Sequence, residues 1–451
     1  MGTLDFVILA LAVVLFGLVS RRLDGTSLTA PMVFVGAGML VGPGALDLLQ
    51  LELSNEVVLV IAEITLVLVL FGDAARIDFR VLRRNAAIPA RLLIIGLPLT
   101  IAAGTLLALP LITDLAFWEA AILAVVLAPT DAALGQAVVT SPLVPARIRQ
   151  ALNVESGLND GLSVPFLTFF VALAVVEEDL EPASFWVRFV LEQIGLGLLI
   201  GLAVGGAGGW LLARSSARGW VTGTFMQLVP LGLAIAAWGA ATEIGGNGFI
   251  AAFVAGLAGG TMTRHLEQHV LDFAEDEGQL LNLTVFFIFG AAVIGPRLDE
   301  ITWEVALYAV LSLTVIRMLP VAIALIGTHL RVSSVAFVGW FGPRGIATIV
   351  LALTVLEDEQ DLPGGDTIVL VSSVAVLFSV LAHGVSAAPL ARIYGRASET
   401  MDEDEPEMAP VPELPARAPM LSDEGRSPLR PHLPGRHRRQ RDGDRSDDEP
   451  H

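Results

Sequence analysis

The chain has 451 residues, of which 54% are hydrophobic and 16% are charged, and its formal net charge at pH 7 is -19. This composition is typical of a polytopic membrane protein and argues against a large soluble core. The absence of cysteine excludes disulfides, thiolate metal sites and a cysteine nucleophile. Because the acidic residues crowd short loops and the C-terminal region, we expect no nucleic-acid partner; the partner of the apolar surface is the lipid bilayer.

Thirteen apolar stretches of about spanning length follow one another along the chain. They lie near 4–20, 28–46, 55–72, 86–110, 114–139, 148–176, 187–212, 222–242, 248–262, 280–295, 303–327, 333–356 and 366–394. The ninth and tenth stretches are short, so either could be re-entrant or tilted, and a count of twelve stays open. We therefore predict an all-α polytopic membrane protein with about thirteen transmembrane helices over residues 1–395.

Arginine placement gives the orientation of these stretches. Loops after the odd-numbered stretches carry Arg21, Arg22, Arg76, Arg80, Arg83, Arg84, Arg147, Arg149, Arg214, Arg218, Arg264 and Arg331. Loops after the even-numbered stretches are mainly acidic. By the positive-inside rule the N-terminus lies outside and the C-terminus is cytoplasmic, in a plasma (inner) membrane. Residues 396–451 are rich in proline and charged residues with few aromatics, which predicts a disordered cytoplasmic tail.

The fifth stretch contains APTDAALG, with Pro129, Thr130 and Asp131 near its middle. Proline removes a backbone donor and disturbs the preceding turn, which a membrane tolerates where the freed carbonyls line a protein or water cavity. A carboxylate beside free carbonyls is a natural site for a hard monovalent cation. The alternative is a proline kink in which Asp131 bonds only to the backbone.

The sixth stretch contains ESGLND, which places two acids inside an apolar segment at a cost of about 3 kcal/mol each. On a helix, Glu155 and Asn159 share one face, and Ser156 and Asp160 share the adjacent face. Asp160 then has a hydroxyl one turn away, which gives two oxygen ligands in register. The alternative is a buried polar cluster that only packs helices together.

Two arginines inside later stretches can neutralise the charge of these acids. Arg317 lies in the eleventh stretch and Arg344 in the twelfth, and one of them is expected to neutralise Glu155 and leave Asp160 to titrate. The twelfth stretch also reads FGPRG, which predicts a second broken helix. Because the fifth and twelfth stretches take corresponding places in two halves, the pattern indicates an inverted-repeat transporter.

The segments APTDAALG, ESGLND and GPRGIATIVLAL resemble the signature segments of the monovalent cation:proton antiporters, in the branch of the bacterial NhaP-type and animal sodium/proton exchangers. The resemblance covers about residues 1–395. It implies two inverted repeats with crossing broken helices, with core helices at about 86–176 and 303–394. It also implies a homodimer and exchange of Na+, or of Li+ or K+, for H+ without a cofactor.

The same resemblance assigns roles to individual residues. Asp160 is the carboxylate that binds ion and proton, and Asn159 is its partner. Thr130, Asp131 and Ser156 surround the ion, while Glu155 pairs with an arginine of the Arg317 or Arg344 type. Asp73, in LFGDAARID, is either an auxiliary ligand or part of a cytoplasmic funnel.

We therefore expect a secondary-active sodium/proton antiporter rather than an enzyme. One titratable carboxylate that binds either a proton or a cation, by alternating access, yields exchange. The Asn-Asp pair implies, by resemblance, electroneutral one-for-one stoichiometry. A K+-preferring antiporter is the first alternative. A cation channel or ion-sensing membrane protein is the second, although the chain shows no pore-like selectivity loop.

Overall fold

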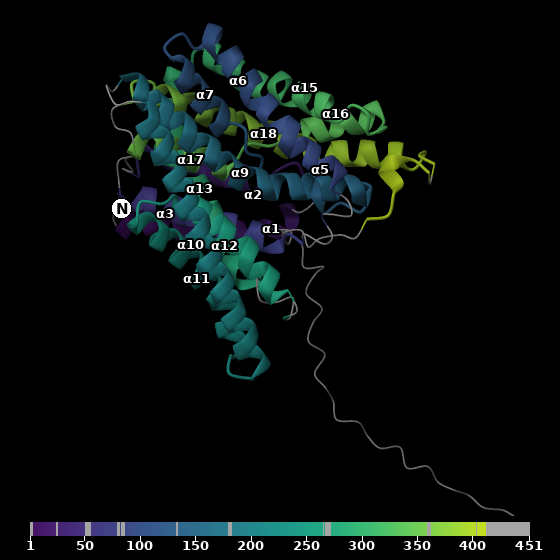
Figure 1. Cartoon of the computed structure of the whole chain (residues 1–451). Coiled ribbons are helices and arrows are strands. Elements are labelled where there is room, and N and C mark those ends of the chain that lie inside the picture. Colours follow the sequence, from purple (N-terminus) through teal and green to yellow (C-terminus); the bar gives the residue numbers. More distant parts are fainter. Residues whose placement is uncertain are drawn as a thin grey trace, which may run out of the picture.

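The computed structural model describes residues 3–23, 26–49, 56–78, 82, 86–131, 134–178, 183–264, 266, 272–358, 362–402 and 404–411. These residues form helices and connecting loops, and none of them lies in a strand (Figure 1). The elements are α1 (Thr3–Leu23), α2 (Ala30–Val41), α3 (Glu56–Arg76), α5 (Ala87–Arg91), the π-helix η1 (Leu92–Gly96), α6 (Leu97–Leu111), α7 (Phe117–Val126), α8 (Gln136–Val139), α9 (Ala146–Glu178), α10 (Ala183–Ala217), α11 (Gly223–Glu243), α12 (Gly248–Thr263), α13 (Asp272–Ile288), the π-helix η3 (Phe289–Ile294), the 3-10 helix η4 (Gly295–Glu300), α14 (Trp303–Leu313), α15 (Val315–Ala324), α16 (Val332–Trp340), α17 (Ile346–Asp358), α18 (Gly365–Ser398) and the 3-10 helix η5 (Pro406–Met408).

Each of the thirteen apolar stretches contains helix. Among the described residues, nine helical segments are long and apolar enough to cross a membrane, and the shorter apolar helices α2, α7, α12 and α17 supply the other four. The tenth stretch, which looked short, is part of a segment from Gly278 to Glu300 that runs through α13, η3 and η4. The polytopic all-α prediction is confirmed.

Two of the thirteen stretches have a wide gap between two helices near their middle. α7 ends at Val126 and α8 begins at Gln136, and α16 ends at Trp340 before α17 begins at Ile346. The breaks fall where proline removes a backbone donor and where neighbouring glycines relax the chain. They meet, because the Asp131 N–H donates a hydrogen bond of 2.7 Å to the Pro343 carbonyl. The predicted crossing of broken helices is present.

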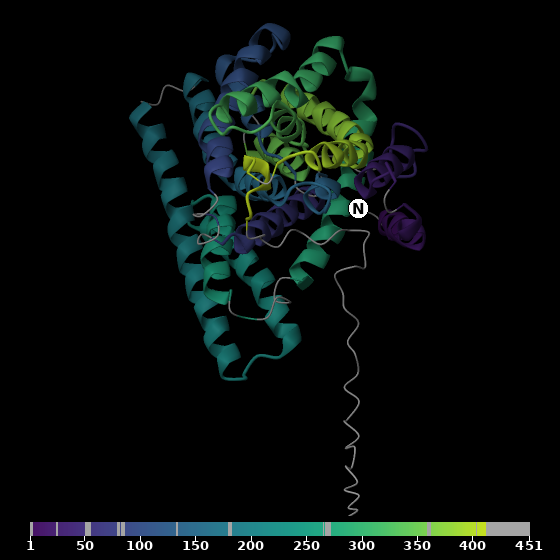
Figure 2. The same cartoon turned by 90° about the vertical axis from the view of Figure 1, so that its right-hand side faces the viewer.

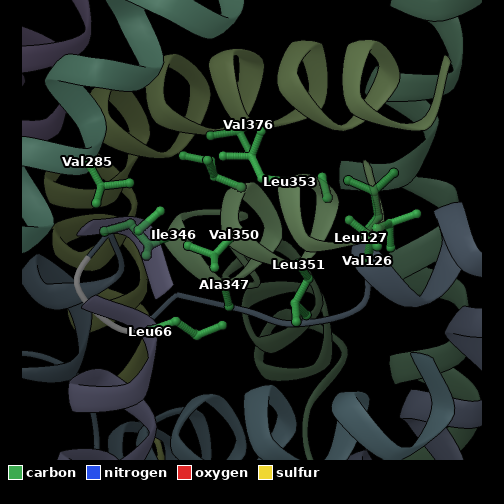
Figure 3. Close-up of a cluster of buried hydrophobic side chains, with 14 of the residues drawn as sticks. Leu66, Val126, Leu127, Val285, Ile346, Ala347, Val350, Leu351, Leu353 and Val376 are labelled. Carbon is green, nitrogen blue, oxygen red and sulfur yellow. The ribbon is translucent and has the colours of Figure 1, made fainter. Parts of the chain in front are cut away.

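The half-helix α17 lies at the centre of the apolar core (Figure 3). Its side chains are buried against four neighbouring elements, α3, α7, α13 and α18. The figure labels Ile346, Ala347, Val350, Leu351 and Leu353 of α17 and, from the surrounding elements, Leu66, Val126, Leu127, Val285 and Val376. A helix that is buried on all sides must be largely apolar all round, which explains why residues 346–356 after the second break are hydrophobic apart from Thr348 and Thr354.

Helices α10, α11 and α12 gather along one side of the molecule (Figures 1 and 2). A row of glycines on α10 lets the α12 backbone approach closely. A Cβ at Gly201, for example, would lie 2.6 Å from the Ala251 carbonyl oxygen. The helix α1 lies at the edge of the molecule away from α10 (Figure 2) and exposes most of its apolar side chains.

Contacts between loops follow the predicted alternation of sides. Arg264, after the ninth stretch, forms an ion pair of 2.8 Å with Asp78, after the third. The Gly364 N–H, after the twelfth stretch, donates 2.7 Å to Glu119 in the first turn of α7, near the start of the fifth stretch. Each contact joins ends of stretches that an even alternation places on the same side.

The chain after α18 folds back onto the ends of α9 and α16. We call residues 404–409 the C-terminal clamp. Its Glu407 is buried and accepts hydrogen bonds from the Arg331 N–H at 2.7 Å and the Ser334 hydroxyl at 2.6 Å. Arg147, at the start of α9, donates to a backbone carbonyl of η5. The ordered part of the chain thus extends beyond the predicted start of the tail at 396, and residues 412–451 lie outside the described residues.

An exposed ion pair adds to the clamp. The Arg331 guanidinium donates to Glu405 and, through this hydrogen bond, lowers the pKa of the Glu405 carboxyl below its usual value. A carboxyl whose pKa is depressed by folding contributes stability that is lost as pH falls through that pKa. The contribution is small because the pair is exposed to solvent.

Candidate ion-binding site

The polar residues of the sixth stretch lie deep inside the molecule on α9. Glu155, Ser156, Asn159 and Asp160 are between 2% and 7% exposed. Charged and amide groups at this depth need partners, since an unpaired buried polar group costs free energy. The hydrogen-bond and ion-pair partners of these four residues therefore indicate the role of this part of α9.

The break between α7 and α8 supplies the first set of partners. The Ser156 hydroxyl donates a hydrogen bond to the Thr130 carbonyl, and the Asn159 amide donates 2.6 Å to the Thr130 hydroxyl. Two residues one turn apart on α9 therefore hold Thr130 by its backbone and its side chain. These contacts gather hydroxyl and carbonyl oxygens around Ser156 and Asn159, and Asp160 is one turn from Ser156 on α9.

The two buried arginines take different partners. Arg317 Nη1 lies 2.5 Å from Glu155 Oε1, with both side chains 3% exposed. Arg344 donates instead to the Ala128 and Pro129 carbonyls at 2.9 and 3.0 Å. These are carbonyls left without helical donors at the C-terminal end of α7. Of the two arginines considered for Glu155, Arg317 makes the contact and Arg344 caps a helix end.

Asp131 lies at the opposite end of the crossing. Its Oδ2 atom accepts a hydrogen bond of 3.2 Å from the Ile346 N–H, the first residue of α17. Gly345 leaves the room for this contact, because a Cβ there would overlap the Asp131 carboxylate. A carboxylate at a helix N-terminus and a guanidinium at a helix C-terminus both oppose the helix dipole. The crossing is therefore neutralised at both ends by side chains.

Gly342 makes room for Arg317 in the same way. A Cβ at Gly342 would lie 2.5 Å from Arg317 Nε. Gly342 and Gly345, on either side of the Pro343–Arg344 pair, thus leave space for two charged side chains, Arg317 and Asp131. These glycines therefore provide space for neighbouring side chains as well as backbone conformational freedom.

Asp73 lies on α3 beside the same stretch of α9. A Cβ at Gly157 would be 3.6 Å from the Asp73 Cβ, so the two helices meet next to Ser156. Asp73 forms an ion pair of 3.9 Å with Arg76, and both side chains are largely buried. The position is compatible with either role considered for Asp73, an auxiliary ligand or the wall of an approach to the site.

Two polar residues on α18, Ser379 and His383, also reach the second break. Ser379 accepts 2.6 Å from the Arg344 N–H, and His383 lies 2.9 Å from the Trp340 carbonyl. The sequence pattern did not single out this pair as part of the site. The signal that was available is a histidine inside an apolar stretch with a serine one helical turn before it.

These features define a class of protein. The chain is a multi-pass membrane protein in which two broken helices cross and a buried carboxylate lies beside the crossing with hydroxyl and carbonyl oxygens. Discontinuous helices that meet near the middle of the membrane are typical of the substrate sites of secondary transporters.

Comparison with known proteins gives the family. The sequence profile described as "Sodium/hydrogen exchanger, transmembrane" matches residues 7–393, and the chain belongs to this family. It is 27% identical over 397 residues to the K(+)/H(+) antiporter NhaP of Alkalimonas amylolytica, a match that covers 87% of this chain and 67% of that protein. It is 26% identical over 282 residues to the K(+)/H(+) antiporter NhaP2 of Shewanella sp. (strain MR-4), covering 62% of this chain and 48% of that one.

A solved structure shares the fold. The sodium proton antiporter MjNhaP1 from Methanocaldococcus jannaschii at pH 8 superposes with a TM-score of 0.70 at 20% identity, covering 85% of this chain and 97% of that one. The chain spans about two thirds of the first curated relative and about half of the second. The fold and the family are therefore established by these matches.

Proposed function

We propose that this protein exchanges a monovalent cation for a proton, with both competing for Asp160 by alternating access. The observation that carries the proposal is the buried polar cluster at the crossing, where Ser156 and Asn159 on α9 hold Thr130 and the buried Asp160 follows one turn after Ser156. Hard cations prefer oxygen ligands. Because metal binding requires the carboxylate to be deprotonated, binding of the cation releases a proton.

The contacts of the other two acids at the crossing fit structural roles. Glu155 contacts Arg317, and Asp131 accepts the N–H at the start of α17. We propose that Glu155 and Arg317 form a structural ion pair, whereas Asp160 alternates between proton and cation. One such acid supports electroneutral one-for-one exchange. Asp131 would act on the cation from the edge of the cluster, and Asp73 along its approach.

Na+ is the cation we propose first, with Li+ or K+ as substitutes. The preference for K+ is a second candidate, because the relatives from Alkalimonas and Shewanella are both named K(+)/H(+) antiporters. The oxygen ligands of the cluster are compatible with either ion.

We also propose the cellular arrangement. The antiporter domain comprises about residues 1–395 in the plasma (inner) membrane, with the N-terminus outside and the C-terminus, including the clamp, in the cytoplasm. Support comes from the arginine-rich loops on the side of the C-terminus. A homodimer is proposed from the family resemblance.

Reconstituted protein tests the proposal directly. Proteoliposomes that contain a pH-sensitive dye are acidified inside, and Na+, Li+ or K+ is then added outside. Cation-dependent dequenching that is absent from D160N supports exchange at Asp160, and the order of the three responses gives the preference. Electrogenic cation flux without coupled proton movement would support the channel alternative instead.

A further inference from the structure

Helix α18 places two buried polar side chains against the break between α16 and α17. Ser379 and His383 lie one turn apart on this helix, and both are 0% exposed. The break leaves backbone groups without helical partners, as every helix end does. Ser379 and His383 bind one such group on each side of it.

On the α16 side, His383 binds the carbonyl of the last helical residue. His383 Nε2 lies 2.9 Å from the Trp340 oxygen, and the two rings pack at 5.1 Å between centroids. Trp340 is also held by its own indole N–H, which donates 3.0 Å to the Ser386 hydroxyl on α18. On the other side, the Arg344 N–H donates 2.6 Å to the Ser379 hydroxyl.

The partners determine which ring nitrogen of His383 carries the proton. The Trp340 carbonyl can only accept, so Nε2 must donate. The Ser379 hydroxyl accepts from Arg344, which leaves its own hydrogen free to bond to Nδ1 at 3.1 Å. A neutral imidazole with its proton on Nε2 satisfies both contacts. The Ser379 carbonyl also lies 3.1 Å from Nδ1, but a bond to it would require a second ring proton.

This pair is connected to the cation cluster through a short run of backbone. Arg344 follows Pro343, whose carbonyl accepts the Asp131 N–H at 2.7 Å. Asp131 follows Thr130, which is held by Ser156 and Asn159 on α9. A shift of the backbone at Arg344 is therefore transmitted through Asp131 to Thr130, which belongs to the proposed cation site.

We propose that Ser379 and His383 are positioning residues, which set the geometry of the cation site by fixing both ends of the α16–α17 break. His383 acts as a neutral hydrogen-bond bridge and does not carry protons. This inference rests on the proposed cation site at Asp160. It differs from a packing role because it predicts a change in cation affinity rather than only in stability.

The test compares alanine variants with a matched control on the same helix. S379A and H383A remove the two bridges. Ser372 is equally buried on α18, and its hydroxyl has no hydrogen-bond partner among the described residues, so S372A is the control. S379T keeps a hydroxyl, and H383Q keeps an amide donor near the position of Nε2.

Two readouts are measured on the full-length chain. The first is the cation concentration that half-maximally raises the melting temperature of purified protein, with NaCl, LiCl or KCl titrated at constant ionic strength. The second is the KM and maximal rate of exchange in proteoliposomes. We expect S379A and H383A to weaken half-saturation by about fivefold or more, the factor that corresponds to about 1 kcal/mol, a typical net hydrogen bond. The maximal rate of exchange in S379A and H383A should change by less than about twofold. S372A, S379T and H383Q should keep a half-saturating cation concentration near that of wild type.

Several outcomes would overturn the inference. One is an unchanged half-saturation in both alanine variants. Another is a loss of stability and rate that S379T and H383Q fail to restore, with unchanged cation affinity, which indicates packing alone. If one alanine variant does not fold, the conservative variant at the same position is compared with the alanine variant that does fold. The bridge is refuted if H383Q or S379T shifts the affinity as much as that alanine variant. Failure of the proposed function is recognised separately, because wild type would then show cation-dependent stabilisation without exchange, or neither.

Discussion

Substitution of Glu155 by glutamine tests whether Glu155 and Arg317 form a buried ion pair that stabilises the core. The substitution removes the charge 2.5 Å from Arg317 and keeps nearly the same shape. Among the described residues, no hydrogen-bond partner reaches Nε or Nη2 of Arg317, so Glu155 is its main counter-charge. Leaving one member of a buried ion pair without its partner costs about 3–5 kcal/mol.

This cost converts into a melting temperature. Globular proteins unfold with an entropy of about 2 cal/mol/K per residue, or roughly 0.8 kcal/mol/K for about 380 described residues, so E155Q should lower Tm by about 4–6 °C. Purified protein in detergent is heated while its unfolding is followed by tryptophan fluorescence. Exchange should fall as well, because Glu155 and Asn159 share a face of α9 and Asn159 holds Thr130.

A double-mutant cycle separates the ion pair from local packing. R317Q should be as destabilised as E155Q, since it leaves the buried carboxylate uncompensated. The double variant E155Q/R317Q should be more stable than the sum of the single effects predicts, because neither charge is then left alone. If E155Q melts like wild type, or if the two effects simply add, then Glu155 and Arg317 are not a coupled buried pair.

Four further results are expected. D160N should abolish cation-driven proton movement without lowering the melting temperature; substantial residual exchange refutes Asp160 as the shared site. With equal pH on both sides, acidification should raise the apparent cation KM by up to about tenfold per pH unit, whereas a flat KM between about pH 8.5 and 5.5 contradicts competition. G345A should weaken cation affinity, because its Cβ overlaps the Asp131 carboxylate; wild-type affinity would show that this contact is dispensable. E407A should destabilise the protein by about 1–3 kcal/mol, because Ser334 loses its buried acceptor, and thermal melting that matches wild type would show that the clamp contributes little.

Much of the fold could be predicted because lipid imposes strong rules on sequence. Spanning length and the proline and glycine breaks are local signals, and the structure contains the helices and the two breaks that they predict. The orientation inferred from the arginine bias stays a prediction. The tenth stretch looked too short because its helix begins among polar residues, and the hydropathy pattern starts only where the helix enters the apolar layer.

The candidate site was only partly predictable. The spacing of ESGLND fixes which residues share a face of α9, and the structure does bring Thr130 to that face. Spacing cannot tell which distant arginine turns toward Glu155, since that depends on how α9, α15 and α16–α17 rotate about their axes. The bridge from His383 to Trp340 joins residues 43 positions apart and has no local pattern.

The C-terminal clamp has a practical consequence for where the chain can be cut or extended. A reporter domain fused directly after Ser398 would replace the segment that carries Glu407, and would leave Arg331 and Ser334 at the start of α16 with lost acceptors. A reporter joined after residue 411 keeps these contacts. Fluorescence-based screening of expression should therefore use the later junction, since the earlier one would score lost contacts at the start of α16 as poor expression of the whole protein.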